Sequence, residues 1–223
     1  MTNESVGRQP GGVSIDRLAA RLCTLYGLEP DVSLRDFVVD DAGRAAMLEA
    51  MPSLASAGAE GREALLIHED TDELLLALLL RDDLSTSDPL QDAGLDGHCA
   101  LLEGISHLLY VLDRARAQRP VSRLELELQA EVDKFVDTWL LRREAQVPIS
   151  PAQLRKRLFT GFTLEAAPEA VPRYREASRL AERYCGWLSE TYLQRARMDS
   201  LLPEVRRFWR MSQSDKIGHI ESR

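Results

Sequence analysis

Apolar residues recur at the spacing of an α-helix along most of the chain. The first helix is predicted to begin after Ser14, which suits an N-cap, and to end at Gly27, which suits a helix C-terminus. Its apolar stripe consists of Ile15, Leu18, Leu22 and Leu25. Between residues 30 and 61, the stretches LRDFVVD and GRAAMLEAM each predict about two helical turns. Residues 1 to 13 hold too few apolar side chains to offset the entropy lost on ordering, so we expect a disordered N-terminus.

The clearest pattern is a pair of long helices within residues 95 to 143. The first has a wide apolar face, and the second begins with a capping box formed by Ser122 and Glu125. The apolar positions are Leu101, Ile105, Leu108, Leu112 and Ala115 in the first helix, and Leu124, Leu128, Val132, Phe135 and Trp139 in the second. Because a short polar connection near Gln118 separates the two, the pattern predicts an antiparallel helix hairpin at the centre of a bundle-like domain.

A small β-hairpin is predicted at about residues 63 to 80. Two apolar runs there flank an acidic stretch, which is typical of two strands joined by a turn. The second run is leucine and alanine without β-branched residues, and Asp70 with Glu73 would form a capping box. A strand followed by a helix is therefore the alternative. The symmetric layout of two runs around one turn favours the hairpin.

Further helices are predicted in the last third of the chain. Ser150 and Gln153 form the capping box of one helix, and Pro172 opens a long one that runs through RYREASRLAERYCGWLSETYLQRARM. A basic amphipathic tail helix is predicted at about residues 200 to 212, with a final turn capped by Ser214. The fold class is therefore expected to be mainly α, with one small β element.

Composition agrees with one globular domain formed by residues 14 to 223, since 44% of the 223 residues are hydrophobic and 29% are charged. The charge is uneven: residues 1 to 150 carry 14 Lys and Arg against 27 Asp and Glu, whereas residues 151 to 223 carry 14 against 9. A basic second part is a weak indication of nucleic-acid binding, and it suits attraction between the two parts equally well.

Several function classes lack support in the sequence. No run of about 18 apolar residues is present and the N-terminus lacks the order of a signal peptide, so we expect a cytoplasmic protein without a transmembrane segment. Cys23, Cys99 and Cys185 are far apart among apolar residues, which predicts buried, reduced thiols. The HExxH, P-loop, GxGxxG and GxSxG motifs are missing, and no metal or cofactor is predicted.

A polar stripe on the helix hairpin is the first candidate site. Glu103, His107 and Glu131, together with Glu127 and with His68 or His98 from outside the helix pair, would form an acid/base or metal site if their side chains met. Because Glu103, His107, Tyr110 and Arg114 fall nearly opposite the leucine face, we expect them to point outward. Glu127 is likewise expected at the periphery, and His98 at the surface. The expected cross-helix pairs are Glu103 with Lys134, Arg114 with Glu127, and His107 with Glu131. We favour these structural ion pairs, because the spacing does not match the Glu-x-x-His motif of bundle metal sites.

The sequence VRRFWR near the C-terminus is the second candidate site. Basic residues interleaved with aromatic ones could contact nucleic acid or an anionic membrane surface. The residues concerned are Arg206, Arg207, Phe208, Trp209 and Arg210. The alternative, which we favour, is that the apolar side chains dock the tail on the body while the arginines meet its acidic surface.

The sequence therefore favours a non-enzymatic binding, adaptor or regulatory module with a protein partner or self-association. The first alternative is a metal-dependent or acid/base enzyme that uses the Glu/His cluster of the helix hairpin. The second alternative is contact with nucleic acid or an anionic membrane through the tail helix, and of these nucleic acid is not expected.

Overall fold

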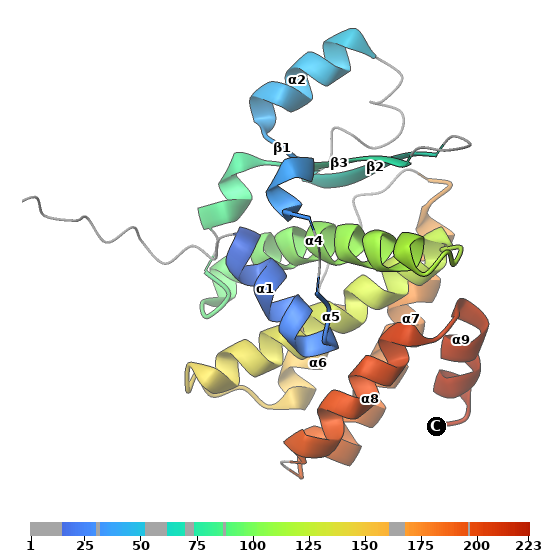
Figure 1. Cartoon of the computed structure of the whole chain (residues 1–223). Coiled ribbons are helices and arrows are strands. Elements are labelled where there is room, and N and C mark those ends of the chain that lie inside the picture. Colours follow the sequence, from blue (N-terminus) through green and yellow to red (C-terminus); the bar gives the residue numbers. More distant parts are fainter. Residues whose placement is uncertain are drawn as a thin grey trace, which may run out of the picture.

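The computed structural model of the chain describes residues 15 to 29, 32 to 51, 62 to 69, 74 to 86, 88 to 160, 168 to 195 and 197 to 223. Eight α-helices and a three-stranded sheet make up this part of the chain (Figure 1). The predicted fold class, mainly α with a small sheet, is confirmed. The N-terminus that we expect to be disordered, residues 1 to 13, lies outside the described residues.

Helices α4 (Leu95–Arg116) and α5 (Arg123–Glu144) are the long pair expected in the middle of the chain. The cap of α5 is confirmed, because Ser122 Oγ accepts a hydrogen bond from the Glu125 backbone N–H at 3.0 Å. The two helices pack against each other and run in opposite senses. Arg114, close to the end of α4, meets the Glu125 carboxylate at the start of α5 at 3.2 Å.

The sheet has the strand order β1-β3-β2, formed by β1 (Val38–Val39), β3 (Leu74–Leu80) and β2 (Glu63–Glu69). β2 and β3 pair antiparallel, with Glu63 opposite Leu80, and the residues that connect them lie outside the described ones. The alternative of a helix over the second apolar run is wrong. The last three leucines of β3 are buried, so both faces of this strand are covered, which explains a run of leucine without polar alternation.

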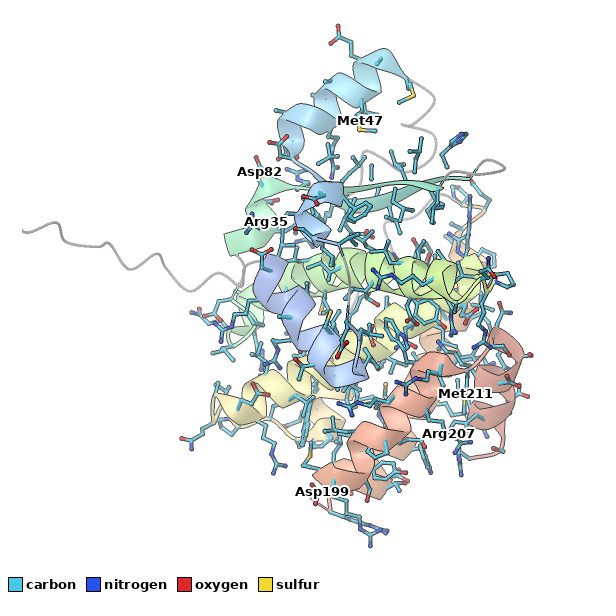
Figure 2. The ribbon with its side chains drawn as sticks, viewed as in Figure 1. Arg35, Met47, Asp82, Asp199, Arg207 and Met211 are labelled. Carbon is cyan, nitrogen blue, oxygen red and sulfur yellow. The ribbon has the colours of Figure 1, made fainter. Side chains whose placement is uncertain are left out.

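Strand β1 corrects the prediction of a helix in LRDFVVD. Only Leu34–Phe37 forms a short 3-10 turn, η1, and the two valines that follow pair parallel to β3, with Val38 opposite Leu78. Pairing with β3 outweighs two turns of helical periodicity because β-branched valine suits an extended backbone. The second predicted short helix is present as α2 (Asp41–Ala50), which lies with Met47 on the side of the sheet opposite α4 (Figures 1 and 2).

Helix α6 (Pro151–Thr160) follows α5 and begins as expected. Its capping box is reciprocal: the Gln153 N–H donates to Ser150 Oγ at 3.1 Å, and the Ser150 N–H donates to Gln153 Oε1 at 3.0 Å. Helix α7 (Val171–Leu188) is shorter than predicted, because the chain changes to a π-turn over Ser189–Leu193, η4, and then leaves the helix. There the Gln194 N–H donates to the Ser189 carbonyl, five residues back, at 2.9 Å, so the expected single helix to Met198 is wrong.

Two helices form the C-terminal part of the chain. Helix α8 (Met198–Arg210) is the predicted tail helix, although it begins two residues earlier than expected. Helix α9 (Gln213–Glu221) is longer than the single turn that we predict, and its N-cap is Ser212 rather than Ser214. The Ser212 Oγ accepts from the Asp215 backbone N–H at 3.2 Å, which is the geometry of an N-cap.

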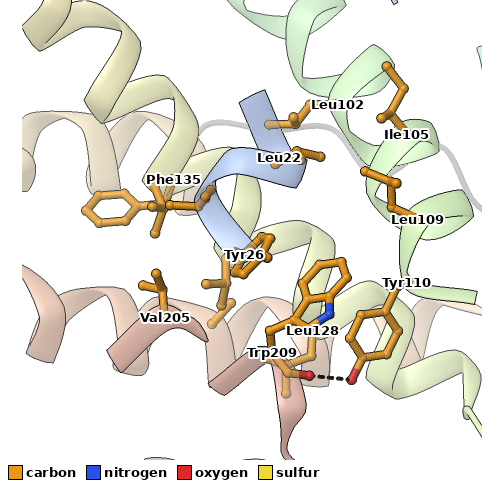
Figure 3. Packing of buried hydrophobic residues seen from close by; sticks show 14 of the residues in the cluster. Leu22, Tyr26, Leu102, Ile105, Leu109, Tyr110, Leu128, Phe135, Val205 and Trp209 are labelled. Carbon is orange, nitrogen blue, oxygen red and sulfur yellow. Dashed lines mark hydrogen bonds between the residues drawn. The ribbon is translucent and has the colours of Figure 1, made fainter. Parts of the chain in front are cut away.

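The core joins the two ends of the described chain. Helix α1 (Ile15–Tyr26) packs on α4 and α8, and Gly27 ends it with a φ of 66°. The Tyr26 ring stacks on Trp209 with centroids 4.2 Å apart, while Tyr110 meets Trp209 edge-on at 4.7 Å (Figure 3). The tail is therefore part of the core rather than an appendage.

Candidate functional site

The polar stripe of α4 is buried, which corrects the expectation that it points outward. His107 is 7%, Tyr110 0% and Arg114 3% exposed. The sheet covers α4 on one side, and α5, α1 and the C-terminal helices cover it on the others (Figure 1). The helical wheel of α4 shows only its strongest apolar face, and a helix enclosed on several sides buries polar positions as well.

One part of this stripe meets a carboxyl group of the sheet. Glu63 at the start of β2 and the side chains of Glu103 and His107 on α4 bring ligand atoms within 4.8 Å of one another. Gly104 permits this approach. A Cβ atom there would lie 2.9 Å from Leu78 Cδ1 and 3.4 Å from the Glu63 carboxylate, so a larger residue would push the sheet away from α4.

A third acidic side chain, Glu127 on α5, closes the group on the other side. Its Oε2 lies 3.6 Å from His107 Nε2, and its Oε1 lies 3.5 Å from Arg173 Nε on α7. Glu127 is buried, although the sequence predicts a peripheral position. We name Glu63, Glu103, His107 and Glu127 the acidic cluster.

Lys134 on α5 links the acidic cluster to a fourth carboxyl group. Its Nζ lies 2.5 Å from Glu103 Oε2 and 2.8 Å from Glu131 Oε1, which confirms the predicted Glu103–Lys134 pair. The other two predicted pairs are wrong, because His107 meets Glu127 rather than Glu131 and Arg114 meets Glu125. The helices cross at an angle (Figure 1), so residue pairing that is correct at one point of the hairpin does not hold farther along the helices.

Burial and neighbouring charges give the carboxyl groups different proton affinities. Burial raises the pKa of Glu63 well above its usual value, and Glu103 and Glu127 raise it further. Burial also raises the pKa of Glu127. In Glu103 the effect of burial is overcome by Lys134 and His107, which lower its pKa. Glu103 is thus the most readily ionised of the three, and Glu63 and Glu127 hold protons more tightly.

Two buried atoms of the acidic cluster have no hydrogen-bond partner among the described residues: Glu63 Oε2 and His107 Nε2. Most buried polar atoms in folded proteins are satisfied, so two unsatisfied atoms from different elements in one cluster require an explanation. One atom is a carboxylate oxygen and the other an imidazole nitrogen, both of which are metal ligands.

The structure brings together two of the three site residues predicted on the helix hairpin. Glu103 and His107 belong to the acidic cluster, while Glu131 instead accepts from Lys134. Glu63 was missed, since its place depends on which face of the sheet meets α4. The only signal for it is that Glu63, Leu65 and Ile67 share one side of β2 by strand alternation.

A second buried polar network lies deeper between α4, α5 and α9. Lys216 is fully buried and donates to Tyr110 OH at 2.9 Å and to Gln129 Oε1 at 2.7 Å. Asp133 accepts from Gln129 Nε2 at 2.8 Å, from Ser106 Oγ at 2.6 Å, and from the Tyr26 hydroxyl. Each of these side chains has a hydrogen-bond partner, so a structural role accounts for the network.

The VRRFWR residues divide between the core and the surface. Phe208 and Trp209 are buried, and Trp209 Nε1 donates to Asp113 at 2.8 Å. Arg206 donates to the backbone carbonyls of Leu25 and Thr24 at the end of α1, at 2.8 and 2.9 Å. These contacts agree with docking of the tail. The aromatic rings are enclosed and offer no face to a nucleic-acid base.

Arg207 and Arg210, the remaining residues of this motif, lie on the outside of α8. The Arg207 side chain is 59% exposed, with Nη1 3.9 Å from Glu204. Arg210 is exposed and donates to the Arg206 carbonyl at 3.3 Å. Both guanidinium groups have partners within α8 itself.

Two histidines lie in positions that the sequence does not suggest. His98, expected at the surface, is 1% exposed with Nε2 3.6 Å from Asp137. His219 in the tail is also buried, and its Nε2 lies 2.6 Å from Glu204 Oε1. Neither belongs to the acidic cluster. The Glu204 carboxylate accounts for the burial of His219, whereas neither ring nitrogen of His98 has a hydrogen-bond partner among the described residues.

Comparisons of the chain with protein-family models, with curated proteins and with solved structures find no match. None of the helices in the described ranges is both long and apolar enough to cross a membrane. The functional argument therefore starts from the geometry of the acidic cluster.

Proposed function

We propose that this chain is a binding protein whose ligand is a divalent transition-metal ion, held by the acidic cluster between β2, α4 and α5. Glu63, Glu103 and His107 would supply the ligand atoms, with Glu127 as a fourth. The observation that carries the proposal is that Glu63, Glu103 and His107 bring three ligand atoms within 4.8 Å of one another. Two of these residues, Glu63 and His107, also have a buried side-chain atom without a hydrogen-bond partner among the described residues.

The charge of the buried group supports this proposal. Among the described residues, four carboxyl groups meet here, and three permanent cations act on them: Lys134, Arg173 and, on Glu63, Arg44. The carboxyl groups therefore outnumber the permanent cations. A bound metal cation would offset the excess negative charge, whereas without it the balance depends on protons held by Glu63 and Glu127.

The donor atoms favour a transition-metal ion over magnesium or calcium. Carboxylate oxygens together with one imidazole nitrogen suit Zn²⁺, Mn²⁺, Fe²⁺ or Co²⁺, while Mg²⁺ and Ca²⁺ prefer oxygen ligands alone. Two cavities of the described part lie elsewhere, one around Asp113 and Trp209 and one around Trp139. On the donor atoms of the acidic cluster, we propose ion binding rather than the enzymatic alternative.

The experiment is a titration of the full chain, after treatment with a chelator, with Zn²⁺, Mn²⁺ or Co²⁺ in a calorimeter. One ion is expected per chain, and Co²⁺ should give visible absorbance bands that report nitrogen and oxygen ligation. Glu63→Gln resembles the protonated carboxyl, so the variant is expected to fold and to bind the ion at least about tenfold more weakly.

The matched control is Glu49→Gln, which removes an exposed carboxylate on α2. It should bind the ion as the unaltered chain does. Absence of saturable binding by the unaltered chain for all three ions would overturn the proposal, as would equal affinities of the Glu63 and Glu49 variants.

A second candidate function, self-association, is favoured by the free edge of the sheet. β2 pairs with β3 on one side and with no other strand of the described residues, and Ile67 near its far end is 44% exposed. Identical edge strands can pair around a two-fold axis. Sedimentation of Ile67→Glu against Met51→Glu, an exposed apolar residue elsewhere, tests this: only the former should shift a dimer to monomer.

A further inference from the structure

Lys134 occupies an unusual place beside the acidic cluster. Its Nζ lies 2.5 Å from Glu103 Oε2, which is a proposed ligand, and 2.8 Å from Glu131 Oε1, which is not. Lys134 and Glu131 are three residues apart on α5, whereas Glu103 belongs to α4. The ammonium therefore has one partner on its own helix and one across the helix interface.

The strength of these contacts follows from the surroundings. The side chains of Glu103, Glu131 and Lys134 are only 13 to 16% exposed, so water screens their charges poorly. Burial tends to lower the pKa of Lys134, but Glu103 and Glu131 raise it well above its usual value. The lysine is a permanent cation that neutralises Glu103 when no ion is bound.

From this geometry we infer that Lys134 competes with the metal ion for Glu103. When the ion binds, the Lys134 ammonium leaves Glu103 and remains paired with Glu131. This inference rests on the proposed metal site. Lys134 would thereby set the affinity and selectivity of the site, because an ion must bind Glu103 more strongly than the ammonium does. Glu131 has a defined part in this exchange, as the second acceptor that keeps the displaced ammonium paired.

The exchange changes which elements are tied together. In the state described, the Glu103–Lys134 pair joins α4 to α5. With the ion bound, Glu103 would join α4 to β2 through the ion and Glu63, while Lys134 and Glu131 would form a pair within α5. Ion binding would thus tighten the sheet on α4 at the expense of one contact between the two central helices.

Two substitutions are expected to act in opposite directions on metal affinity. Lys134→Met removes the competitor and should raise the affinity for Zn²⁺ or Co²⁺ by about tenfold or more, a size typical of coupling between two ligands of one site. Glu131→Gln removes the alternative acceptor, so Lys134 holds Glu103 more firmly and affinity should fall. The matched control is Lys156→Met, which removes an exposed lysine of α6.

The titrations separate failure of this inference from failure of the proposed function. If the unaltered chain binds none of the ions, the metal site itself is overturned, and the inference with it. If the unaltered chain binds and Lys134→Met binds equally or more weakly, only the competition is overturned. If Lys134→Met folds only with the ion present, the inference is supported, and Glu131→Gln provides the deciding test. An unchanged or higher metal affinity of Glu131→Gln overturns the proposed exchange of Lys134 for the ion.

Discussion

Lys216 and Asp133 are joined through a single amide group. The Gln129 side chain accepts from Lys216 Nζ at 2.7 Å and donates to Asp133 Oδ1 at 2.8 Å, so the buried cation and the buried carboxylate do not touch. Burial lowers the pKa of Lys216 to about 7 and raises that of Asp133 to about 6. Both groups therefore change charge near neutral pH inside the core.

The first prediction concerns alkaline pH and Lys216. Between about pH 7 and 10.5 the unfolded chain binds a proton that the folded chain does not, so this lysine makes stability rise with pH. The free energy of unfolding of the unaltered chain, minus that of Lys216→Met, should increase by about 2 to 3 kcal/mol from pH 7 to about 9.5. Urea unfolding at several pH values measures this. Lys156→Met should follow the unaltered chain, and a constant difference for Lys216→Met would refute the prediction.

The second prediction concerns acid pH and Asp133. Because the folded pKa is above the usual 3.8, the folded chain binds more protons between about pH 4 and 6. The stabilising contribution is present below this range and is lost as pH rises through about 6. From about pH 4 to 6, the Asp133 carboxyl should lower the free energy of unfolding of the unaltered chain by about 2 to 3 kcal/mol. This decrease should be absent in Asp133→Asn.

The comparison for Asp133 is Asp36→Asn, which removes an exposed carboxyl of η1. Its unfolding free energy should vary with pH as in the unaltered chain. Parallel curves for Asp133→Asn and Asp36→Asn would show that the Asp133 carboxyl carries no such proton in the folded state.

The third prediction concerns the docking of the tail through Trp209. Its ring is 1% exposed, stacks on Tyr26 and meets Tyr110 edge-on. Trp209→Ala should lower the free energy of unfolding by about 3 to 5 kcal/mol, the range for truncation of a buried aromatic residue. Arg210→Ala, next in the chain and exposed, should change it by less than about 0.5 kcal/mol. Equal, small effects would mean that the tail is not part of the core.

The fourth prediction compares two helical glycines. A Cβ at Gly104 would lie 2.9 and 3.2 Å from leucine side chains of β3, whereas a Cβ at Gly218 in α9 would meet nothing within 4 Å. Gly104→Ala should destabilise by about 1 to 2 kcal/mol, because overpacking outweighs the gain in helix propensity. Gly218→Ala should stabilise by about 0.5 to 1 kcal/mol. Melting temperatures that rise for both variants would show that α4 and the sheet are not closely packed.

Local pattern was sufficient for most helices of the fold. The caps at Ser122 and Ser150 and the turn at Gly27 were predictable because each depends on a few neighbouring residues. The break after Leu188 was not, because Ser189–Leu193 contains neither proline nor glycine and a π-turn replaces the regular turns there. The strand at Val38 was not either, since it exists only through pairing with β3.

The candidate site was predictable only within the helix pair. Counting positions across a straight hairpin was enough to pair Glu103 with Lys134, but not to place His107, because the helices cross at an angle. Glu63 enters from another element, and its side chain reaches α4 only because Gly104 leaves room. Lys216 resembles an ordinary surface lysine in sequence, and its burial depends on contacts with α4 and α5.

Arg206 donates to the Leu25 and Thr24 carbonyls, across 181 and 182 positions of the sequence. During synthesis on the ribosome, the end of α1 would thus lack its cap, and Tyr26 its stacking partner, until α8 has emerged. Contacts of such long separation slow folding because a long loop must close first. A nascent chain stalled before Met198 should remain open to protease near Tyr26, while one extended past α8 should be protected, so completion of this part of the fold waits for the synthesis of α8.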